Sequence, residues 1–197
     1  MTPAFERPDL AGDLLHRTAE ARQYRHRLIR AQLPAAEMGR ARHLDIANGN
    51  VLRRIVAEHG WPTRALVGEA GVWAVWEIAL YADPMADFQR LALRLLTTAV
   101  EQGEATVQQW AHLHDRCETN ADGCQTFGTQ YRLGPHGPQL VPVESPDELD
   151  QRRESVRLRP HREALANLRR RLGWAPPDGP AHRLLSEPVP LLAGVSA

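Results

Sequence analysis

Residues 68–82 read GEAGVWAVWEIALYA and contain the longest apolar run of the chain, about Val72–Ala82, which is broken by Glu77. The run is too short to cross a bilayer, because a spanning helix needs about 20 apolar residues. Apart from Glu69 and Glu77 the stretch is apolar nearly all round, which is typical of a helix at the centre of a bundle. It therefore predicts a central helix.

Helical spacing of apolar residues continues on both sides of this stretch. It predicts a first helix over Leu10–Gln32 and a second that ends at Gly60, where a glycine stop is expected. Asp83 and Pro84 supply an N-cap and a first helical residue for a helix to about residue 102, and another covers 104–118.

Glycine and proline recur at short intervals in the segment after Asn120, so long helices are not expected there. Segments 125–133 and 139–143 can pair as a hairpin across residues 134–137. Ser145 and Glu148 form a capping box that predicts a helix over 148–158, and Pro160 starts a last helix to about residue 172.

These patterns predict a mainly α protein, a single-domain helical bundle of about six to seven helices over residues 1–174. A small β-hairpin is inserted at about 121–144, and a proline-rich C-terminal tail follows at 175–197. We expect the tail to be extended.

All 24 basic residues are arginine, and they balance 24 acidic residues. The absence of lysine excludes Schiff-base and pyridoxal-phosphate chemistry and a GK[ST] phosphate loop, and suggests a high-GC bacterial genome. A balanced charge does not favour nucleic-acid binding. Glu6 and Asp9 stand where a signal peptide would be basic and apolar, so we expect a cytoplasmic protein with no membrane partner and with free thiols at its two cysteines.

Asp45, Asn48 and Leu52 share one stripe of the second helix, which places an acid and an amide beside packing residues. Such a carboxylate can act as a base or hold a substrate. Alternatively, the polar pair is a buried bracket that ties this helix to the corner at Gly60-Trp61-Pro62.

Asp115 and Arg116 lie near the end of the fifth predicted helix. A buried arginine requires a planar anion, which is either Asp45 or Asp115 as part of the fold or the carboxylate of a substrate. In the following loop Gln125 and Gln130 offer donors and acceptors to a polar ligand, the alternative being an ordinary edge hairpin.

Tyr81 ends the central apolar helix, where its phenol is either a proton donor or a core residue with a hydrated hydroxyl. No GxSxG or GxGxxG motif occurs, so we expect neither a serine hydrolase nor an organic cofactor.

The residue types of a metal site gather at His112, His114, Cys117 and Cys124. On a helix His112 and His114 point about 200° apart and cannot bind one ion together. We expect no metal; the alternative is a three-ligand site of His114, Cys117 and Cys124.

Taken together, the motifs Asp45-x-x-Asn48, Gly60-Trp61-Pro62, Leu113-x-Asp115-Arg116 and Phe127-Gly128-Thr129-Gln130 resemble those of an uncharacterised bacterial family, a domain of unknown function. The resemblance covers about Arg22–Leu158 and implies one helical domain with no known reaction. The chain departs from the family pattern at three positions. Tyr81 stands where a histidine is usual, Arg22 replaces an acidic residue, and Phe127 replaces a tyrosine. The chain is thus identified as a divergent member.

We expect a small cytoplasmic enzyme without an organic cofactor that uses acid-base or positioning catalysis on a small polar or peptide-like molecule, in a bacterial biosynthetic pathway. The alternative is a non-catalytic immunity or regulatory protein that binds a peptide. The predicted catalytic residues are Asp115, Tyr81 and Asp45, and the predicted substrate-binding residues are Arg116, Asn48, Trp61, Gln125 and Gln130.

Overall fold

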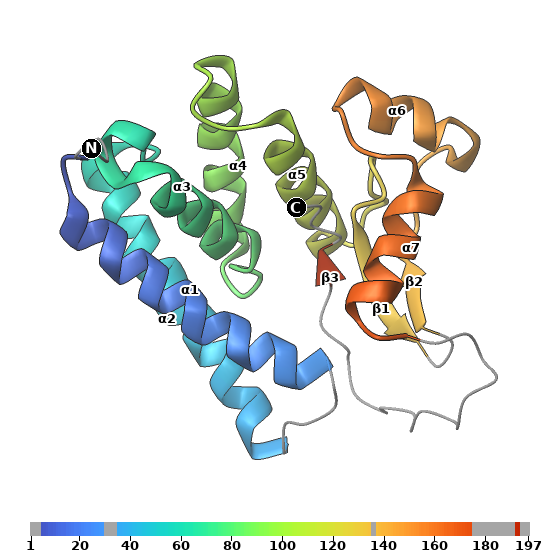
Figure 1. Cartoon of the computed structure of the whole chain (residues 1–197), viewed down its shortest axis with the longest axis horizontal. Coiled ribbons are helices and arrows are strands. Elements are labelled where there is room, and N and C mark those ends of the chain that lie inside the picture. The colour runs from blue at the N-terminus through green and yellow to red at the C-terminus, as the bar shows by residue number, and fades with distance from the viewer. Residues whose placement is uncertain (1–4, 30–34, 135–136, 175–191, 194–197) are drawn as a thin grey trace. The chain divides into compact units, whose positions relative to one another are not determined.

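The computed structural model describes residues 5–29, 35–134, 137–174 and 192–193, which fall into two compact units. Unit 1 is Met1–Thr106 and unit 2 is Val107–Ala197. The prediction of a mainly α chain with a small β-hairpin is confirmed (Figure 1). The described helices do not include one that is long and apolar enough to cross a membrane.

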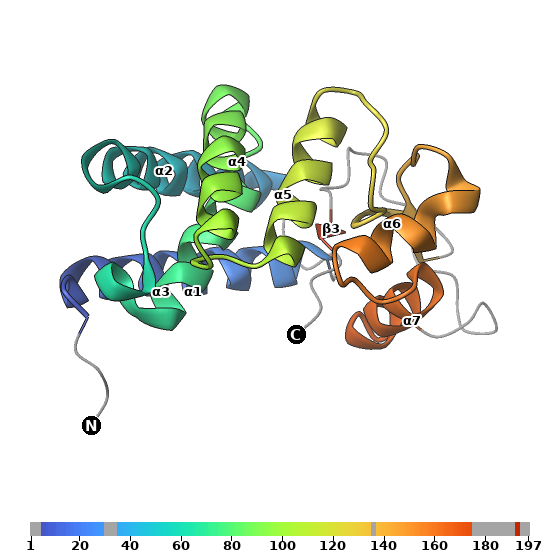
Figure 2. The ribbon, with the colours of Figure 1, turned by 90° about the horizontal axis from the view of Figure 1, so that it is seen from above.

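The described residues of unit 1 form four helices. These are α1 (Pro8–Ile29), α2 (Ala35–His59), α3 (Arg64–Leu80) and α4 (Ala86–Glu101). Helix α3 carries the apolar stretch and packs against the other three, with α1 running along it (Figures 1 and 2). Three residues of α3 are fully buried: Val75, Ala79 and Leu80. The helix therefore lies at the centre of unit 1, as the sequence predicts.

In unit 1 the predicted end of α2 at Gly60 agrees with the structure, whereas the predicted starts of α3 and α4 differ from it. Helix α2 stops at His59, and Gly60 continues with φ 71°, a left-handed conformation that glycine adopts without strain. Helix α3 starts earlier than expected, because the hydroxyl of Thr63 caps it by accepting a hydrogen bond from the amide of Leu66 at 3.3 Å.

The predicted N-cap at Asp83 is wrong. Helix α4 begins at Ala86, after a turn in which the amide of Met85 donates to the carbonyl of Ala82 at 2.8 Å. Asp83 instead accepts a hydrogen bond from the buried amide of Gln89 at 3.2 Å. The demand of that buried amide for acceptors overrides the local capping preference.

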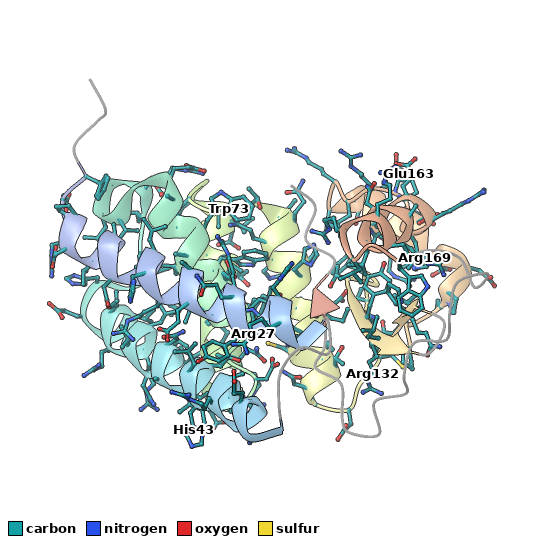
Figure 3. The ribbon with its side chains drawn as sticks, turned by 60° about the horizontal axis from the view of Figure 1, so that its bottom comes forward. Arg27, His43, Trp73, Arg132, Glu163 and Arg169 are labelled. Atoms are coloured by element: carbon teal, nitrogen blue, oxygen red, sulfur yellow. The ribbon has the colours of Figure 1, made fainter. Side chains whose placement is uncertain are left out.

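Unit 2 combines helices with a small sheet. Its elements are α5 (Val107–Asn120), β1 (Gln130–Gly134), β2 (Gly137–Leu140), the 3₁₀ turn η1 (Pro146–Glu148), α6 (Leu149–Ser155), α7 (His161–Arg171) and β3 (Leu192–Ala193). The strand order is β2-β1-β3, both pairings being antiparallel. Helix α7 packs on β2 and turns charged side chains such as Glu163 and Arg169 outward (Figure 3).

The predicted hairpin forms, although its first strand is shorter than expected. Residues 125–129 make no ladder with β2, because their backbone folds around a side chain of α5, as described below. The predicted capping box at Ser145 is wrong: Ser145 has φ 36° and makes no capping hydrogen bond from its side chain. A 3₁₀ turn starts the helical segment, which ends at Ser155 before Arg157 at φ 56°. The tail lies mostly outside the described residues, and β3 is the part of it that the structure describes.

The kink at Gly68 within α3 generates a prediction. Gly68 has φ 72° and ψ 171°, a region open almost exclusively to glycine, and an added Cβ would lie 2.8 Å from Cδ1 of Phe5. Gly68→Ala should lower the free energy of unfolding by about 2 kcal/mol, measured by urea denaturation. Gly12→Ala, where an added Cβ meets no atom within 4 Å, should leave stability unchanged or raise it. Equal stability of the two variants would contradict the strain at Gly68.

Candidate functional site

In unit 1 the carboxylate of Glu77 on α3 is buried and held by two arginines of α1. Nε of Arg22 donates to both carboxylate oxygens, at 3.0 and 2.7 Å, and Nη2 of Arg25 donates to Oε1 at 2.8 Å. The hydrogen bonds and charge of Glu77 raise the pKa of Arg22 above its usual value. This geometry satisfies a charge that burial would otherwise disfavour.

Arg25 connects this ion pair to two of the predicted site residues. Its Nη1 donates to Oδ1 of Asp45 on α2 at 3.1 Å, and its guanidinium carbon lies 3.7 Å from the centre of the Tyr81 ring. One planar cation thus contacts two carboxylates and an aromatic face at once. We call Arg22, Arg25, Asp45, Glu77 and Tyr81 the Arg25 cluster.

The other predicted residues of unit 1 occupy different places. Asn48 is buried one turn after Asp45, and its Oδ1 accepts a hydrogen bond from Nη1 of Arg17 at 3.4 Å. Trp61 is also buried, but Asp45 lies 14 residues before the end of α2, about 21 Å along the helix axis. Arg25 therefore links Asp45 with Tyr81, whereas Asn48 is bound by Arg17 and Trp61 lies beyond the far end of α2.

Three members of the Arg25 cluster are not among the site residues that the sequence predicts: Arg22, Arg25 and Glu77. The available signal was Glu77 itself, a lone acid in the second half of an apolar helix, since a buried carboxylate needs donors. Its partners were not identifiable from the sequence, because they lie more than 50 positions away on another helix.

In unit 2 the carboxylate of Asp115 on α5 is fully buried and organises the loop that precedes β1. It accepts hydrogen bonds from the backbone amides of Thr126, Phe127 and Thr129, each with a shortest distance of 2.9 Å, and from the hydroxyl of Thr129 at 2.9 Å. Four donors converge on one side chain, which fixes the loop against the helix.

Gln125, Gln130 and Arg116 extend this network, and all three are buried. The amide nitrogen of Gln125 donates to the carbonyls of Gln130 and Val141, and its oxygen accepts from the amide of Gln130 at 2.8 Å. The side-chain oxygen of Gln130 accepts from Nη1 of Arg116 at 3.1 Å, and its nitrogen donates to the carbonyl of His112 and to the hydroxyl of Thr129. The hydrogen bonds of both glutamines thus link α5, the loop and the sheet within unit 2.

Arg153 on α6 also binds this loop. It is buried, and its Nη1 donates to the carbonyls of Phe127 and Gly128 at 2.7 and 3.1 Å, while Nε donates to that of Arg159 at 2.7 Å. Burial lowers the pKa of Arg153 and raises that of Tyr131 to about 12. Arg153 thus stabilises the loop through its carbonyl groups, as Asp115 does through its amides.

The alternative metal site at His114, Cys117 and Cys124 is not formed. Within the described part of the chain no three His, Cys, Asp or Glu side chains are grouped as metal ligands would be. The His114 ring packs against Trp110 and Phe127, at centroid distances of 5.0 and 5.8 Å. Cys117 is buried, whereas Cys124 is exposed beyond the end of α5.

Residues 8–174, most of the chain, match the model of a family described as a family of unknown function, DUF6624. The chain belongs to this family. No curated protein and no solved structure matches the chain. The DUF6624 match extends over both units, so the Arg25 cluster and the Asp115 network both lie within the family domain.

The Asp115 network leads to a stability prediction. Asp115→Asn replaces one acceptor oxygen by an NH₂ group that faces amide donors, and should lower the free energy of unfolding by about 3 kcal/mol in urea denaturation. Asp122→Asn is the matched control, because Asp122 is exposed at φ 58°, a conformation that asparagine tolerates. If both variants were as stable as the wild type, Asp115 would not hold the loop.

The burial of the His112 ring leads to a prediction about stability in acid. Burial lowers the pKa of His112 to about 4 from 6.5. Because the unfolded chain binds this proton at a higher pH than the folded chain, stability is full above pH 6.5 and falls as the pH drops toward 4. The loss should reach about 3 kcal/mol.

Urea denaturation between pH 7.5 and 4.5 tests this, with His112→Gln expected to show a smaller loss of stability with acid than the wild type. His43→Gln, at an exposed position of α2, is the control and should keep the wild-type slope. The same slope in His112→Gln as in the wild type would mean that another group causes the acid sensitivity.

Proposed function

We propose that this member of the DUF6624 family is a small enzyme that works by acid-base and positioning catalysis without an organic cofactor, and that the Arg25 cluster is its site. The single observation that supports the proposal is the contact of one guanidinium with Asp45, Glu77 and the ring of Tyr81. A base and a phenol held by the same rigid cation are positioned to act on one bound molecule.

The roles follow from exposure and chemistry. Glu77 is buried and fixes the arginines, whereas Asp45 and Tyr81 are partly exposed and face incoming molecules more readily. In the proposed reaction Asp45 takes up a proton and Tyr81 donates one. Arg22, whose side chain is 61% exposed, orients the substrate, and the buried amide of Asn48 supports the site from α2 through its hydrogen bond with Arg17.

The proposed substrate is a small polar or peptide-like molecule. Two guanidinium and two carboxylate groups balance within the Arg25 cluster, so the site carries no excess charge to attract a polyanion. A zwitterion or an amide suits such a site, because it offers both donors and acceptors to the paired groups. We place the reaction in the bacterial cytoplasm, in a biosynthetic pathway.

In this proposal Asp115, Arg116, Gln125 and Gln130 support the fold of unit 2. Their burial and shared hydrogen bonds are those of a structural network, and substrate contact is not needed to explain them. Trp61 is left out of the site because of its distance from Asp45 along α2.

Turnover of a defined panel of amino acids, dipeptides and their amide and N-acyl derivatives, followed by mass spectrometry, tests the proposal. Tyr81→Phe and Asp45→Asn should each lower kcat at least 100-fold on a converted substrate while the variants remain folded by circular dichroism. Tyr24→Phe and Asp87→Asn, outside the Arg25 cluster, are the matched controls and should keep full activity. Unchanged kcat in both cluster variants would refute the assigned roles.

The alternative is a non-catalytic protein that binds a peptide or small molecule, in an immunity or regulatory role. The mutual neutralisation of the Arg25 cluster favours it, because holding a ligand requires no proton transfer. It would be supported if members of the same panel shift the NMR resonances of Asp45 and Tyr81 and none is converted.

A further inference from the structure

The central strand of the small sheet in unit 2 is covered on one edge by a strand from the C-terminal tail. Strand β3 pairs antiparallel with β1, with Gln130 opposite Ala193 and Tyr131 opposite Leu192. On its other edge β1 pairs with β2 over Tyr131–Gly134. The first two residues of β1 thus depend on a distant segment for their second neighbour.

This covering strand comes from outside the family domain. The DUF6624 match ends at residue 174, and β3 begins 18 residues later. Five prolines occur between these points, and the last of them is Pro190. Residues 191–197, LLAGVSA, contain neither proline nor charge, so every amide in this segment can donate to a strand.

In the part of the chain that the structure describes, the strand β3 covers only the first two residues of β1. Among the described residues β3 covers Gln130 and Tyr131, whereas Arg132, Leu133 and Gly134 pair on the β2 side only. Exposed amides and carbonyls along a strand edge are a template for a further extended chain. The two residue pairs that the structure describes supply few hydrogen bonds, and the covalent link of β3 to the chain adds to them by raising its effective concentration at β1.

We propose that this edge of β1 is a binding site for an extended peptide and that β3 is the resident strand that occupies it within the same chain. The fitting peptide is uncharged, with an apolar residue opposite Tyr131 and a small residue opposite Gln130, since both of these residues are buried. Backbone hydrogen bonds to β1 supply the affinity, and a partner peptide binds when it displaces β3. The inference concerns unit 2 and is independent of the function proposed for the Arg25 cluster.

Binding of a fluorescent synthetic peptide with the sequence of residues 188–197, PVPLLAGVSA, to the full chain tests the proposal. In the double variant Leu192→Pro/Ala193→Pro the resident strand lacks the amides it needs for pairing, so fluorescence anisotropy should show binding at least tenfold tighter than to the wild type. Ser186→Pro/Glu187→Pro, a change of the tail outside β3, is the matched control and should bind the peptide as the wild type does.

Hydrogen exchange gives a second readout that does not depend on the probe. The amides of the Gln130–Tyr131 segment should exchange faster in Leu192→Pro/Ala193→Pro than in the wild type, and adding the peptide should restore their protection. A peptide carrying proline at the positions of Leu192 and Ala193 should neither bind nor protect. Equal peptide binding by the wild type and the β3 variant, or no binding by either, would overturn the proposal.

Discussion

A carboxylate that is removed from water must be met by hydrogen-bond donors, and this constraint organises both units of the chain. In unit 1 the donors to Glu77 are guanidinium groups from another helix, so satisfying the charge ties α1 to α3. In unit 2 the donors to Asp115 are mainly backbone amides, so satisfying the charge folds a loop onto α5. The same requirement thus produces a helix contact in one unit and a loop conformation in the other.

The Arg25 cluster and the Asp115 network also differ in how far solvent reaches them, because their donors are of different kinds. Side-chain donors leave the members of the Arg25 cluster at different exposures, with Glu77 buried and Asp45 and Tyr81 partly accessible. Backbone donors enclose Asp115, whose side chain is fully buried. Arg153 and the two glutamines complete that enclosure, and the loop they hold leads directly into β1. The loop therefore sets the start of the strand to which both β2 and β3 pair.

The candidate site was partly predictable. Asp45 and Asn48 stood out because their spacing puts them on the packing stripe of α2, and Tyr81 because it ends the apolar helix. The sequence did not point to Arg22, Arg25 and Glu77 as one group. Helical periodicity shows which face of a helix is apolar, but it does not show which charged residue of another helix that face contacts. Trp61 lies beyond the end of α2, about 21 Å along the helix axis from Asp45, and helical spacing does not show whether a residue after the helix turns back toward it.

The sequence by itself determined the mainly α class, the apolar helix of unit 1, the end of α2 at Gly60 and the helix after Pro160. These features depend on local terms, namely apolar periodicity and the backbone preferences of glycine and proline. The tertiary structure decided what lies between them. Asp83 accepts a hydrogen bond from Gln89 instead of capping α4, and residues 125–129, the first part of the expected strand, fold as a loop around Asp115. Both outcomes arise because a buried polar group recruits whichever partner the fold brings near, and that partner need not be close in the sequence.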